Sequence, residues 1–466
     1  MKLYNTLTRQ TDEIQPLHAG KLKIYTCGPT VYDYAHIGHW FNYIRMDTLV
    51  RAAQADGFDT TWVMNITDVG HLVSDADDGE DKLEKGAKRE GKTAWEVAEF
   101  YTEDFLECME LLHIQQPTYI VKATDHIEEQ IKLIETLETK GYTYVIDDGV
   151  YYDTSKFEGY AAFARLDLDE QQEGARVSVN DQKKNASDFA LWKFSPQDHK
   201  RDMEWPSPWG TGFPGWHIEC SAMAMTYLGE TLDIHTGGID HIPVHHTNEI
   251  AQSEAATGKR FANYWMHSNH LTIEGEKISK SLGNGIRLQE ILEQGISADA
   301  VRLNVLESHY RSQSKFSMET LQASANRLKH WQQVADLVWQ PQTSGESISA
   351  GIVQAADDIR NALTNDLNTA QILSIVDQLF SAVEANFLTA ADVEPFNEFL
   401  DYLDAILGID LHSKADLTHA EKQLLTERQT TRDAKDWARS DALRDQLLSA
   451  GIGVRDTAAG QIWYRS

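Results

Sequence analysis

Hydrophobic and polar positions in the first third of the chain predict alternating strands and helices. An apolar segment at 21–27 predicts a strand, a helical period runs from 39 to 56 and stops at Gly57, and an apolar segment at 60–66 predicts the next strand. A strand, a helix and a strand in this order form a βαβ unit with a parallel sheet.

The alternation is interrupted and later resumes. An acidic loop at 74–86 and helical patterns near 93–113 and 125–140 lead into polar, glycine- and proline-containing sequence at 142–213, which begins with a hairpin-like segment. We interpret this sequence as an insertion into the sheet. After it, the pattern predicts helices over 217–228 and 246–257 and strands over 232–237 and 264–273.

From about residue 287 the pattern is helical nearly to the end, with a linker at 340–347 and two short strands around a turn at 451–466. The fold class predicted from these patterns is α/β. It comprises a Rossmann-like parallel sheet interrupted by an insertion, then a helical bundle and a small C-terminal α/β domain.

Composition narrows the class of protein. The chain has 466 residues, too many for one hydrophobic core, and no apolar run reaches the roughly eighteen residues of a membrane span. The first residues lack the apolar core of a signal peptide, so we expect a cytoplasmic protein without a membrane partner. Cys27, Cys108 and Cys220 are too few and too far apart for a disulfide framework, and we expect reduced thiols that bind metal or are buried.

The formal net charge of −30 argues against general affinity for nucleic acids, because phosphate binding depends on lysine and arginine displacing counterions. Two segments contain more basic than acidic residues, unlike the chain as a whole. Residues 301–330 hold five basic groups against Glu307 and Glu319, and residues 420–466 hold eight basic against seven acidic groups. These segments are either local contacts for a polyanion or chance fluctuations on a solvated acidic surface.

Two short motifs are candidates for binding phosphates. His36 and His39, in HIGH, follow the first predicted strand at the start of its helix, where backbone N–H groups and the helix dipole favour an anion. Lys277 and Lys280, in KISKS, lie in a polar loop after a later strand and could neutralise charge that develops on a triphosphate. Taken alone, the first motif could be an incidental pair and the second a solvated basic loop.

Cys27, Cys220, His245 and Glu249 form a candidate zinc site of two thiolates, an imidazole and a carboxylate. His245 and Glu249 are four residues apart and share a helix face, a spacing that is also common for surface pairs. The cysteines are 193 residues apart (220 − 27), so no local zinc spacing is present. Cys27 and the His/Glu pair lie at or just beyond predicted strand ends, the edge where open α/β sheets bind ligands.

HIGH after the first strand and KISKS after the last resemble the paired signatures of class I aminoacyl-tRNA synthetases. Over essentially the whole chain, the order and spacing of motifs resemble those of the cysteinyl-tRNA synthetase family. The motifs are YTCGPTVYD, HIGH, NITD, PGWHIECSAM, DIHTGGID, HHTNEIAQS, YWMHS, KISKSLGN and HYRSQ.

The resemblance implies roles for particular residues. It implies one zinc ion per chain, held by the four residues of the candidate zinc site. It also implies an amino-acid pocket lined by Thr67 and Trp216, with Asp240 near the ammonium group of the substrate. The implied catalytic residues are His36, His39, Lys277 and Lys280, with ATP contacts from His36, His39 and Lys280.

The implied reaction is activation of L-cysteine with ATP and Mg²⁺ to cysteinyl-adenylate, followed by transfer to the 3′ end of tRNA(Cys). An apolar pocket separates cysteine poorly from serine and alanine, whereas zinc coordination of the thiolate is a sharper filter, so no editing domain is expected. We expect a monomer.

The resemblance also implies a division into domains. The expected parts are the first half of the catalytic domain at 1–126, a connective insertion at 127–212, the second half at 213–275, the KISKS loop and stem-contact region at 276–335, a helical bundle at 336–411 and an anticodon-binding domain at 412–466. Within the last part, Arg432 and Trp437 could hold an exposed base by charge and stacking. Alternatively, Trp437 docks an amphipathic helix on its neighbour.

Two other functions remain open from the sequence. One is a ligase that joins cysteine to an amino sugar, which would share the zinc set and the adenylation chemistry but lack the anticodon region. The other is a catalytically inactive paralogue that binds tRNA or zinc as a regulator. The intact His36, His39 and Lys280 argue against the inactive paralogue.

Overall fold

The computed structural model divides the chain into two compact units, residues 1–294 with 310–316, and residues 295–309 with 317–466. The six expected domains stay a prediction. No helix among the described residues is long and apolar enough to cross a membrane. The described residues are 1–70, 81–166, 182–197, 200–273, 276–277, 285–343, 345–412, 415–457 and 460–465.

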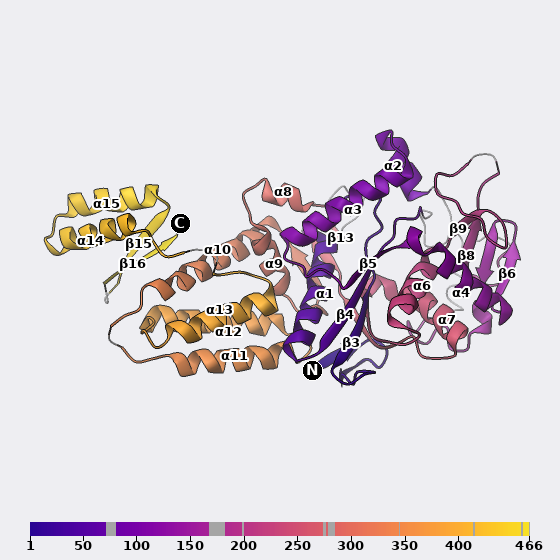
Figure 1. Cartoon of the computed structure of the whole chain (residues 1–466), viewed down its shortest axis with the longest axis horizontal. Helices are drawn as coiled ribbons and strands as arrows, with labels where there is room; N and C mark the ends of the chain where they lie inside the picture. The colour runs from indigo at the N-terminus through magenta and orange to yellow at the C-terminus, as the bar shows by residue number, and fades with distance from the viewer. Residues whose placement is uncertain are drawn as a thin grey trace. The chain divides into compact units, whose positions relative to one another are not determined.

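The first unit is built on a five-stranded parallel sheet with the order β11-β10-β3-β4-β5. This arrangement confirms the predicted parallel sheet that is interrupted along the chain and completed later. Figure 1 shows its strands with α1 and α6 on either side. The strands are β3 Lys21–Thr26, β4 Asp59–Ile66, β5 Tyr119–Lys122, β10 Leu232–Gly238 and β11 Ala262–Ser268.

The main helices of this unit begin within two residues of their predicted starts. Helix α1 starts two residues earlier than predicted, because His36 is its N-cap and its side chain accepts a hydrogen bond from the Gly38 backbone. Thr93 and Glu96 form a reciprocal capping box at the start of α3. The helices are α1 Ile37–Ala55, α3 Ala94–Leu111, α6 Trp216–Leu228 and α7 Thr247–Thr257.

The strands of this unit differ from the prediction in several places. The short strand β5 was not predicted, because four residues are too few for a clear pattern. The single strand predicted at 264–273 is two strands, β11 and β12 (Leu271–Ile273), which belong to different sheets. Strand β14 (Ser314–Phe316) interrupts the region predicted as helical and pairs with β12, and β13 (Glu276–Lys277) pairs with β12 on its other edge. A pattern in sequence carries no information on which sheet a strand joins.

The predicted acidic loop at 74–86 is partly helical. Its segment 81–86 contains the start of α2 (Lys82–Glu90), whose N-cap Asp81 accepts hydrogen bonds from the backbones of Leu83 and Glu84. Residues 74–80 lie outside the described part of the chain. A two-stranded hairpin of β1 (Lys2–Asn5) and β2 (Gln10–Glu13) was also not predicted.

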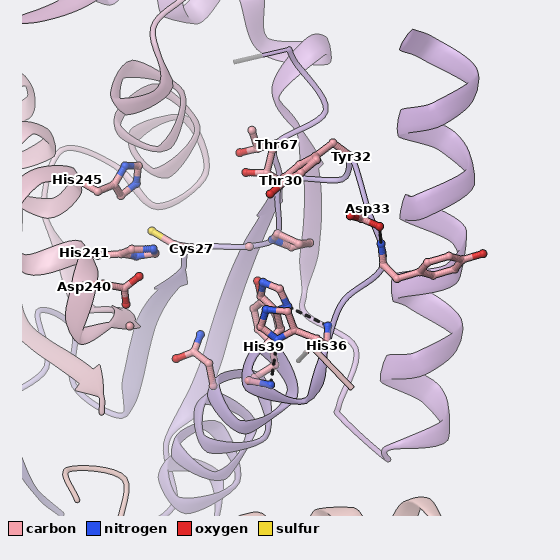
Figure 2. Close-up of a pocket in the computed structure, with 18 of the residues that line it drawn as sticks. Cys27, Thr30, Tyr32, Asp33, His36, His39, Thr67, Asp240, His241 and His245 are labelled. Atoms are coloured by element: carbon pink, nitrogen blue, oxygen red, sulfur yellow. Dashed lines mark hydrogen bonds between the residues drawn. The ribbon is translucent and has the colours of Figure 1, made fainter. Parts of the chain in front are cut away.

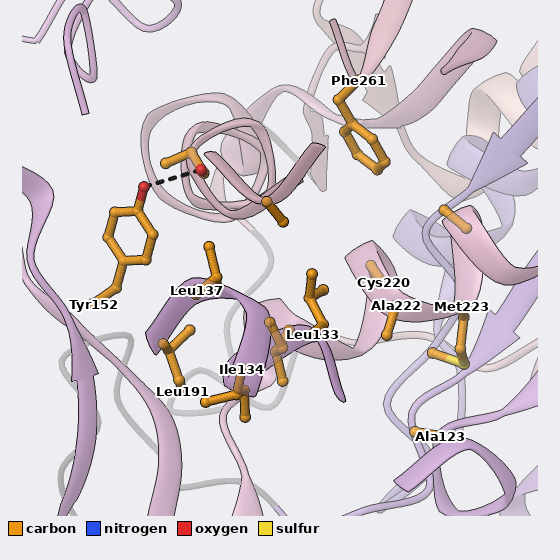
Figure 3. Packing of buried hydrophobic residues seen from close by; sticks show 14 of the residues in the cluster. Ala123, Leu133, Ile134, Leu137, Tyr152, Leu191, Cys220, Ala222, Met223 and Phe261 are labelled. Atoms are coloured by element: carbon orange, nitrogen blue, oxygen red, sulfur yellow. Dashed lines mark hydrogen bonds between the residues drawn. The ribbon is translucent and has the colours of Figure 1, made fainter. Parts of the chain in front are cut away.

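The insertion contains a four-stranded antiparallel sheet with the order β6-β7-β8-β9. Its first two strands confirm the predicted hairpin. Figure 3 shows how side chains of α4, β7 and β8 meet those of α6 in one hydrophobic core, where the Tyr152 hydroxyl donates to the Ala251 carbonyl at 3.0 Å. The elements are η1 Ala123–His126, α4 Ile127–Thr139, β6 Thr143–Ile146, β7 Gly149–Tyr152, β8 Phe189–Phe194 and β9 Gly212–Pro214, and α8 Leu288–Leu292 follows near the end of the unit.

The second unit is helical and ends in an antiparallel hairpin, β15 (Ile452–Thr457) with β16 (Gly460–Arg465), as predicted. A small core of Leu417, Leu425, Leu447, Ile452 and Trp463 packs α14 and α15 on this hairpin, the yellow region of Figure 1. The helices are α9 Ala298–Leu306, α10 Met318–Ala335, α11 Ser349–Leu363, α12 Thr369–Asn386, α13 Val393–Leu407, α14 His419–Asp433 and α15 Trp437–Ser449.

Candidate active site

A cavity of about 1030 Å³ opens at the carboxyl edge of the parallel sheet. Strands β3 and β10 are neighbours in the middle of the sheet, yet the chain leads from β3 to β4 on one side and from β10 to β11 on the other. Segments that follow such strands diverge and leave a crevice between them. Cys27 and Gly28 after β3, and Asp240 and His241 after β10, line this cavity.

His36 and His39 are held by the backbone at the start of α1. The His36 N–H donates to His39 Nδ1 at 3.0 Å, the Gly38 N–H donates to His36 Nδ1 at 3.1 Å, and the two rings stack with centroids 3.8 Å apart, as Figure 2 shows. Because both Nδ1 atoms accept, each neutral ring carries its hydrogen on Nε2. Both residues line the cavity.

The structure brings the four residues of the candidate zinc site together. The donor atoms of Cys27, Cys220, His245 and Glu249 lie within 4.8 Å of one another, and all four residues are buried. Among the described residues, Glu249 Oε2 has no hydrogen-bond partner, although His245 Nε2 and His246 Nε2 each lie 3.7 Å from it. A buried carboxylate oxygen without a hydrogen-bond donor is costly unless a cation binds it.

The chemistry of this donor set fits zinc. Burial raises the pKa of the Cys27 thiol well above its usual range, so the thiol stays protonated while no cation is near. Two thiolates, an imidazole and a carboxylate suit Zn²⁺, whereas Mg²⁺ and Ca²⁺ prefer oxygen ligands alone. Binding of such an ion would release the thiol protons.

A second donor set shares two of these residues. Cys27, His235, His246 and Glu249 also have donor atoms within 4.8 Å of one another and are buried. His235 Nε2 lies 3.0 Å from Glu249 Oε1, and His246 Nε2 lies 3.4 Å from Cys27 Sγ. Burial lowers the pKa of His246 well below its usual range, so this imidazole is neutral. Neither histidine was predicted from the sequence as a metal ligand, although they lie in the motifs DIHTGGID and HHTNEIAQS.

Thr67, Trp216 and Asp240 all line the same cavity. The Trp216 ring lies 4.5 Å from the His245 ring and covers that side of the donor set. Asp240 is exposed in the turn after β10. The Thr67 hydroxyl donates to buried Glu219 Oε2 at 3.0 Å, which the sequence did not predict.

Asn65 and Gly28 also line the cavity. Neither was predicted from the sequence as a site residue, although both lie in the quoted motifs. Asn65 Oδ1 accepts from the Gly28 N–H at 2.8 Å and lies 3.7 Å from Cys220 Sγ. A Cβ atom on Gly28 would lie 1.6 Å from the Asn65 carbonyl oxygen, so only glycine fits there. The glycine after Cys27 and the asparagine of NITD were the signals in the sequence.

Cationic residues also border the cavity. Lys85 and Arg89 of α2 and Arg287 before α8 line it, and none of the three was predicted from the sequence. Lys277 lies in β13, paired with Thr272 of β12. Lys280 lies outside the described residues.

The two residues assigned to the anticodon lie together in the second unit. The Arg432 guanidinium lies over the Trp437 ring at 5.6 Å from its centroid and forms an ion pair with Asp456 at 3.0 Å. Trp437 is 56% exposed at the first turn of α15, so it does not dock this helix on its neighbour.

The fold is that of class I aminoacyl-tRNA synthetases. The family described as the class I (C) tRNA synthetase catalytic domain matches residues 13–326, and the cysteinyl-tRNA ligase anticodon binding domain matches residues 414–463. A solved structure of methionyl-tRNA synthetase from Mycobacterium tuberculosis, in complex with methionyl-adenylate, shares the fold with a TM-score of 0.58 at 16% identity, over 83% of this chain and 89% of that one.

Proteins that are similar to this chain over its full length identify the family more closely. The chain is 45% identical to cysteine–tRNA ligase 1 of Burkholderia lata, over 99% of this chain and 96% of that protein. It is 41% identical to the cysteine–tRNA ligase of Treponema denticola, over 100% and 99% respectively. The chain belongs to the cysteine–tRNA ligase family.

Proposed function

We propose that this ligase activates L-cysteine with ATP to cysteinyl-adenylate and transfers the cysteinyl group to tRNA(Cys). One observation carries the proposal. A single cavity is lined by a pair of imidazoles at a helix start and, across the sheet edge, by Cys27, Cys220 and His245, whose buried donor set Glu249 completes. The imidazole pair at the helix start suits a nucleotide phosphate, and the donor set suits a soft metal ion that binds a thiol ligand.

In the first step the carboxylate of cysteine attacks the α-phosphorus of ATP, and diphosphate leaves. The protein needs no nucleophile of its own, and its contribution is alignment and charge stabilisation. His36 and His39 carry hydrogens on Nε2 that can donate to phosphate oxygens, while the backbone holds both rings in place. Lys280 and Lys277, from the sequence motif, and Mg²⁺ bound to ATP would neutralise the departing diphosphate.

Cys27, Cys220, His245 and Glu249 would hold the zinc ion. Zinc in this site would bind the thiolate of the substrate, for which the hydroxyl of serine and the methyl of alanine are poor substitutes. Trp216 covers the donor set, and Asp240 at the cavity wall can accept from the substrate ammonium group. Thr67 orients buried Glu219 beside Cys220.

In the second step a terminal ribose hydroxyl of tRNA attacks the adenylate carbonyl, and AMP leaves. Arg432 and exposed Trp437 supply a cation and a stacking surface in the part of the chain that matches an anticodon binding domain.

Two assays with one variant test the proposal. We expect cysteine-dependent exchange of diphosphate into ATP, with little exchange for serine, and cysteinylation of a tRNA(Cys) transcript. Lys280→Ala should lower the exchange rate by about 10²–10³-fold, because its contact strengthens as charge develops on the phosphates, and should leave the Kd of cysteine unchanged. Lys259→Ala is the matched control, since Lys259 pairs with Glu230 on the surface. Exchange without tRNA charging would point to the amino-sugar ligase.

A further inference from the structure

The backbone of Thr67 is fixed at the cavity wall by two hydrogen bonds. Its N–H donates to the Pro29 carbonyl at 2.9 Å, and its carbonyl accepts from the Val31 N–H at 3.2 Å. Thr67 also lines the cavity. Because both backbone groups are engaged, the side-chain hydroxyl is the remaining polar group with which this residue can meet a bound molecule.

The hydrogen bonds of this hydroxyl have a direction that is set by a backbone amide. The Gly28 N–H can only donate, and it donates to Asn65 Oδ1 at 2.8 Å. The other end of the Asn65 amide is therefore its NH₂ group, which donates to Thr67 Oγ1 at 3.1 Å. The Thr67 hydroxyl in turn donates to Glu219 Oε2 at 3.0 Å. The order of donors thus runs from the Gly28 backbone to the Glu219 carboxylate.

This order leaves the Thr67 hydroxyl with an acceptor site alone. A hydroxyl has one hydrogen and two lone pairs. The hydrogen points to Glu219, and one lone pair accepts from Asn65. The second lone pair has no donor in the part of the chain that the structure describes. Thr67 therefore suits a bound group that donates, such as an ammonium group, and does not suit a carboxylate.

We propose that Asn65 and Glu219 are positioning residues that fix Thr67 as a hydrogen-bond acceptor for the ammonium group of the substrate. The proposal rests on the proposed function, which places an amino acid in this cavity. Asn65, Thr67 and Glu219 are buried, so bulk water does not compete for their hydrogen bonds. An ammonium group has three hydrogens, so it can donate to Thr67 and to Asp240 together.

Glu219 acts through the hydroxyl of Thr67. Of the described residues that line the cavity, Thr67 is one and Glu219 is not. Without Glu219, the NH₂ group of Asn65 still donates to Thr67 Oγ1. The hydroxyl hydrogen then turns to the cavity, where it faces the hydrogens of the ammonium group. Loss of Glu219 should therefore weaken the binding of the ammonium group in the same way as loss of the hydroxyl.

Two ligands that differ in one group test the contact. 3-Mercaptopropionate has the thiol and the carboxylate of cysteine and lacks its ammonium group. The Kd of each ligand is measured by calorimetry on the zinc-loaded, full-length protein. Thr67→Val keeps the shape of threonine without the hydroxyl, and Thr67→Ser is the matched control that keeps the hydroxyl. We expect Thr67→Val to weaken the binding of cysteine by about 10–100-fold and that of 3-mercaptopropionate by less than about twofold, with Thr67→Ser like the parent protein.

Further variants test the two positioning residues. Glu219→Leu should change both Kd values as Thr67→Val does, and the double variant should lose no more cysteine affinity than Thr67→Val alone. Losses that add would overturn the role of Glu219, because they would mean that its charge acts on the substrate directly. Asn65→Asp, added to Glu219→Leu, still accepts from the Gly28 N–H and supplies a carboxylate that accepts from Thr67. It should restore cysteine affinity, and a failure to do so would remove Asn65 from the proposal.

The outcomes separate this proposal from the proposed function. A parent protein without cysteine-dependent exchange of diphosphate into ATP overturns the proposed function. A parent protein that has this activity, with a Thr67→Val variant that keeps the ratio of the two Kd values, overturns the ammonium contact alone. Equal weakening of both ligands does the same, because a damaged pocket or metal site affects the thiol and carboxylate that the two ligands share. This test of Thr67 stands even where Glu219→Leu does not fold.

Discussion

At the scale of single residues, the two oxygens of Glu249 have different surroundings. Oε1 lies 3.0 Å from His235 Nε2, while Oε2 has no hydrogen-bond partner in the part of the chain that the structure describes. The sequence predicted Glu249 and His245 from their spacing on one helix. It could not predict that His235 and His246 lie beside Glu249 and Cys27, because their places depend on how β10 and β11 pack against the turn before α7. Pairing between distant strands leaves no local pattern.

Cys220→Ser should remove most of the bound zinc, because a hydroxyl is a far weaker zinc ligand than a thiolate. Cys108→Ser is the matched control. Cys108 is equally buried, but it lies in α3, where the Gln289 amide donates to its sulfur at 3.1 Å. Metal analysis of the purified proteins should give about one zinc per chain for the control. Full zinc content in Cys220→Ser would contradict the assignment of this ligand.

Asp68 should make stability depend on pH near neutrality. Burial raises its pKa to about 6, while its oxygens accept from the Thr124 N–H at 2.9 Å and hydroxyl at 2.6 Å. A raised carboxyl pKa means that the folded state binds the proton more tightly. Asp68 therefore contributes its full stabilisation of the folded state below the unfolded-state pKa of 3.8, and this contribution is lost as the pH rises through the folded-state pKa of about 6.

Asp68→Asn keeps a donor and an acceptor for Thr124 and does not titrate. Between pH 5.5 and 7.5 the free energy of unfolding of the parent protein should fall by about 1 kcal/mol, and that of the variant should not. This difference corresponds to a relative shift of roughly 2 °C in the thermal midpoint. Scanning calorimetry of both proteins at several pH values measures this difference. Parallel midpoints across that range would show that Asp68 does not titrate there.

At the scale of elements, the sequence predicted the helices and strands that have a sustained hydrophobic pattern or a distinct first residue. Helix α1, helix α3 and strands β3 and β4 are of this kind. The misses are short or depend on tertiary contacts. The start of helix α2 was predicted as a loop because the segment is rich in charged residues. Asp81 is the N-cap of this helix, and it also forms an ion pair with Arg201, 120 residues further along the chain. Such a partner is not visible in a local pattern.

Asp81→Ala should loosen α2. The carboxylate caps the helix and neutralises Arg201, which is buried and also donates to the Gly70 carbonyl at 3.2 Å. Loss of one partner of a buried ion pair costs about 3–5 kcal/mol, whereas loss of an exposed N-cap costs about 1 kcal/mol. Thr93→Ala, which removes the N-cap of α3, is the control.

Amide hydrogen exchange separates these outcomes. Protection of α2 should fall by about 10²-fold or more in Asp81→Ala and stay unchanged in Thr93→Ala. Because Lys85 and Arg89 line the cavity, the KM for ATP should rise in the first variant only. Equal protection of α2 in both variants would mean that Arg201 finds another partner.

At the scale of the whole molecule, the candidate active site and the region that matches an anticodon binding domain lie in different units. The net charge of −30 disfavours nucleic acids in general, so specific tRNA binding requires local cationic and aromatic groups. Unit 1 contains the candidate active site, and unit 2 contains the region that matches an anticodon binding domain. Activation of cysteine and recognition of tRNA should therefore be separable by mutation.

Trp437→Ala tests this separation. Trp437 is 56% exposed and carries Arg432 over its ring, so its loss should not unfold α15. The loss of a base stack costs about 1–3 kcal/mol, which predicts a fall of about ten- to a hundredfold in kcat/KM for tRNA(Cys). Cysteine-dependent exchange of diphosphate into ATP should not change. Trp339→Ala is the matched control, because Trp339 is 43% exposed in the same unit and lies outside the matched anticodon domain. A similar loss of tRNA charging in both variants, or no loss in Trp437→Ala, would remove Trp437 from the proposed tRNA contact.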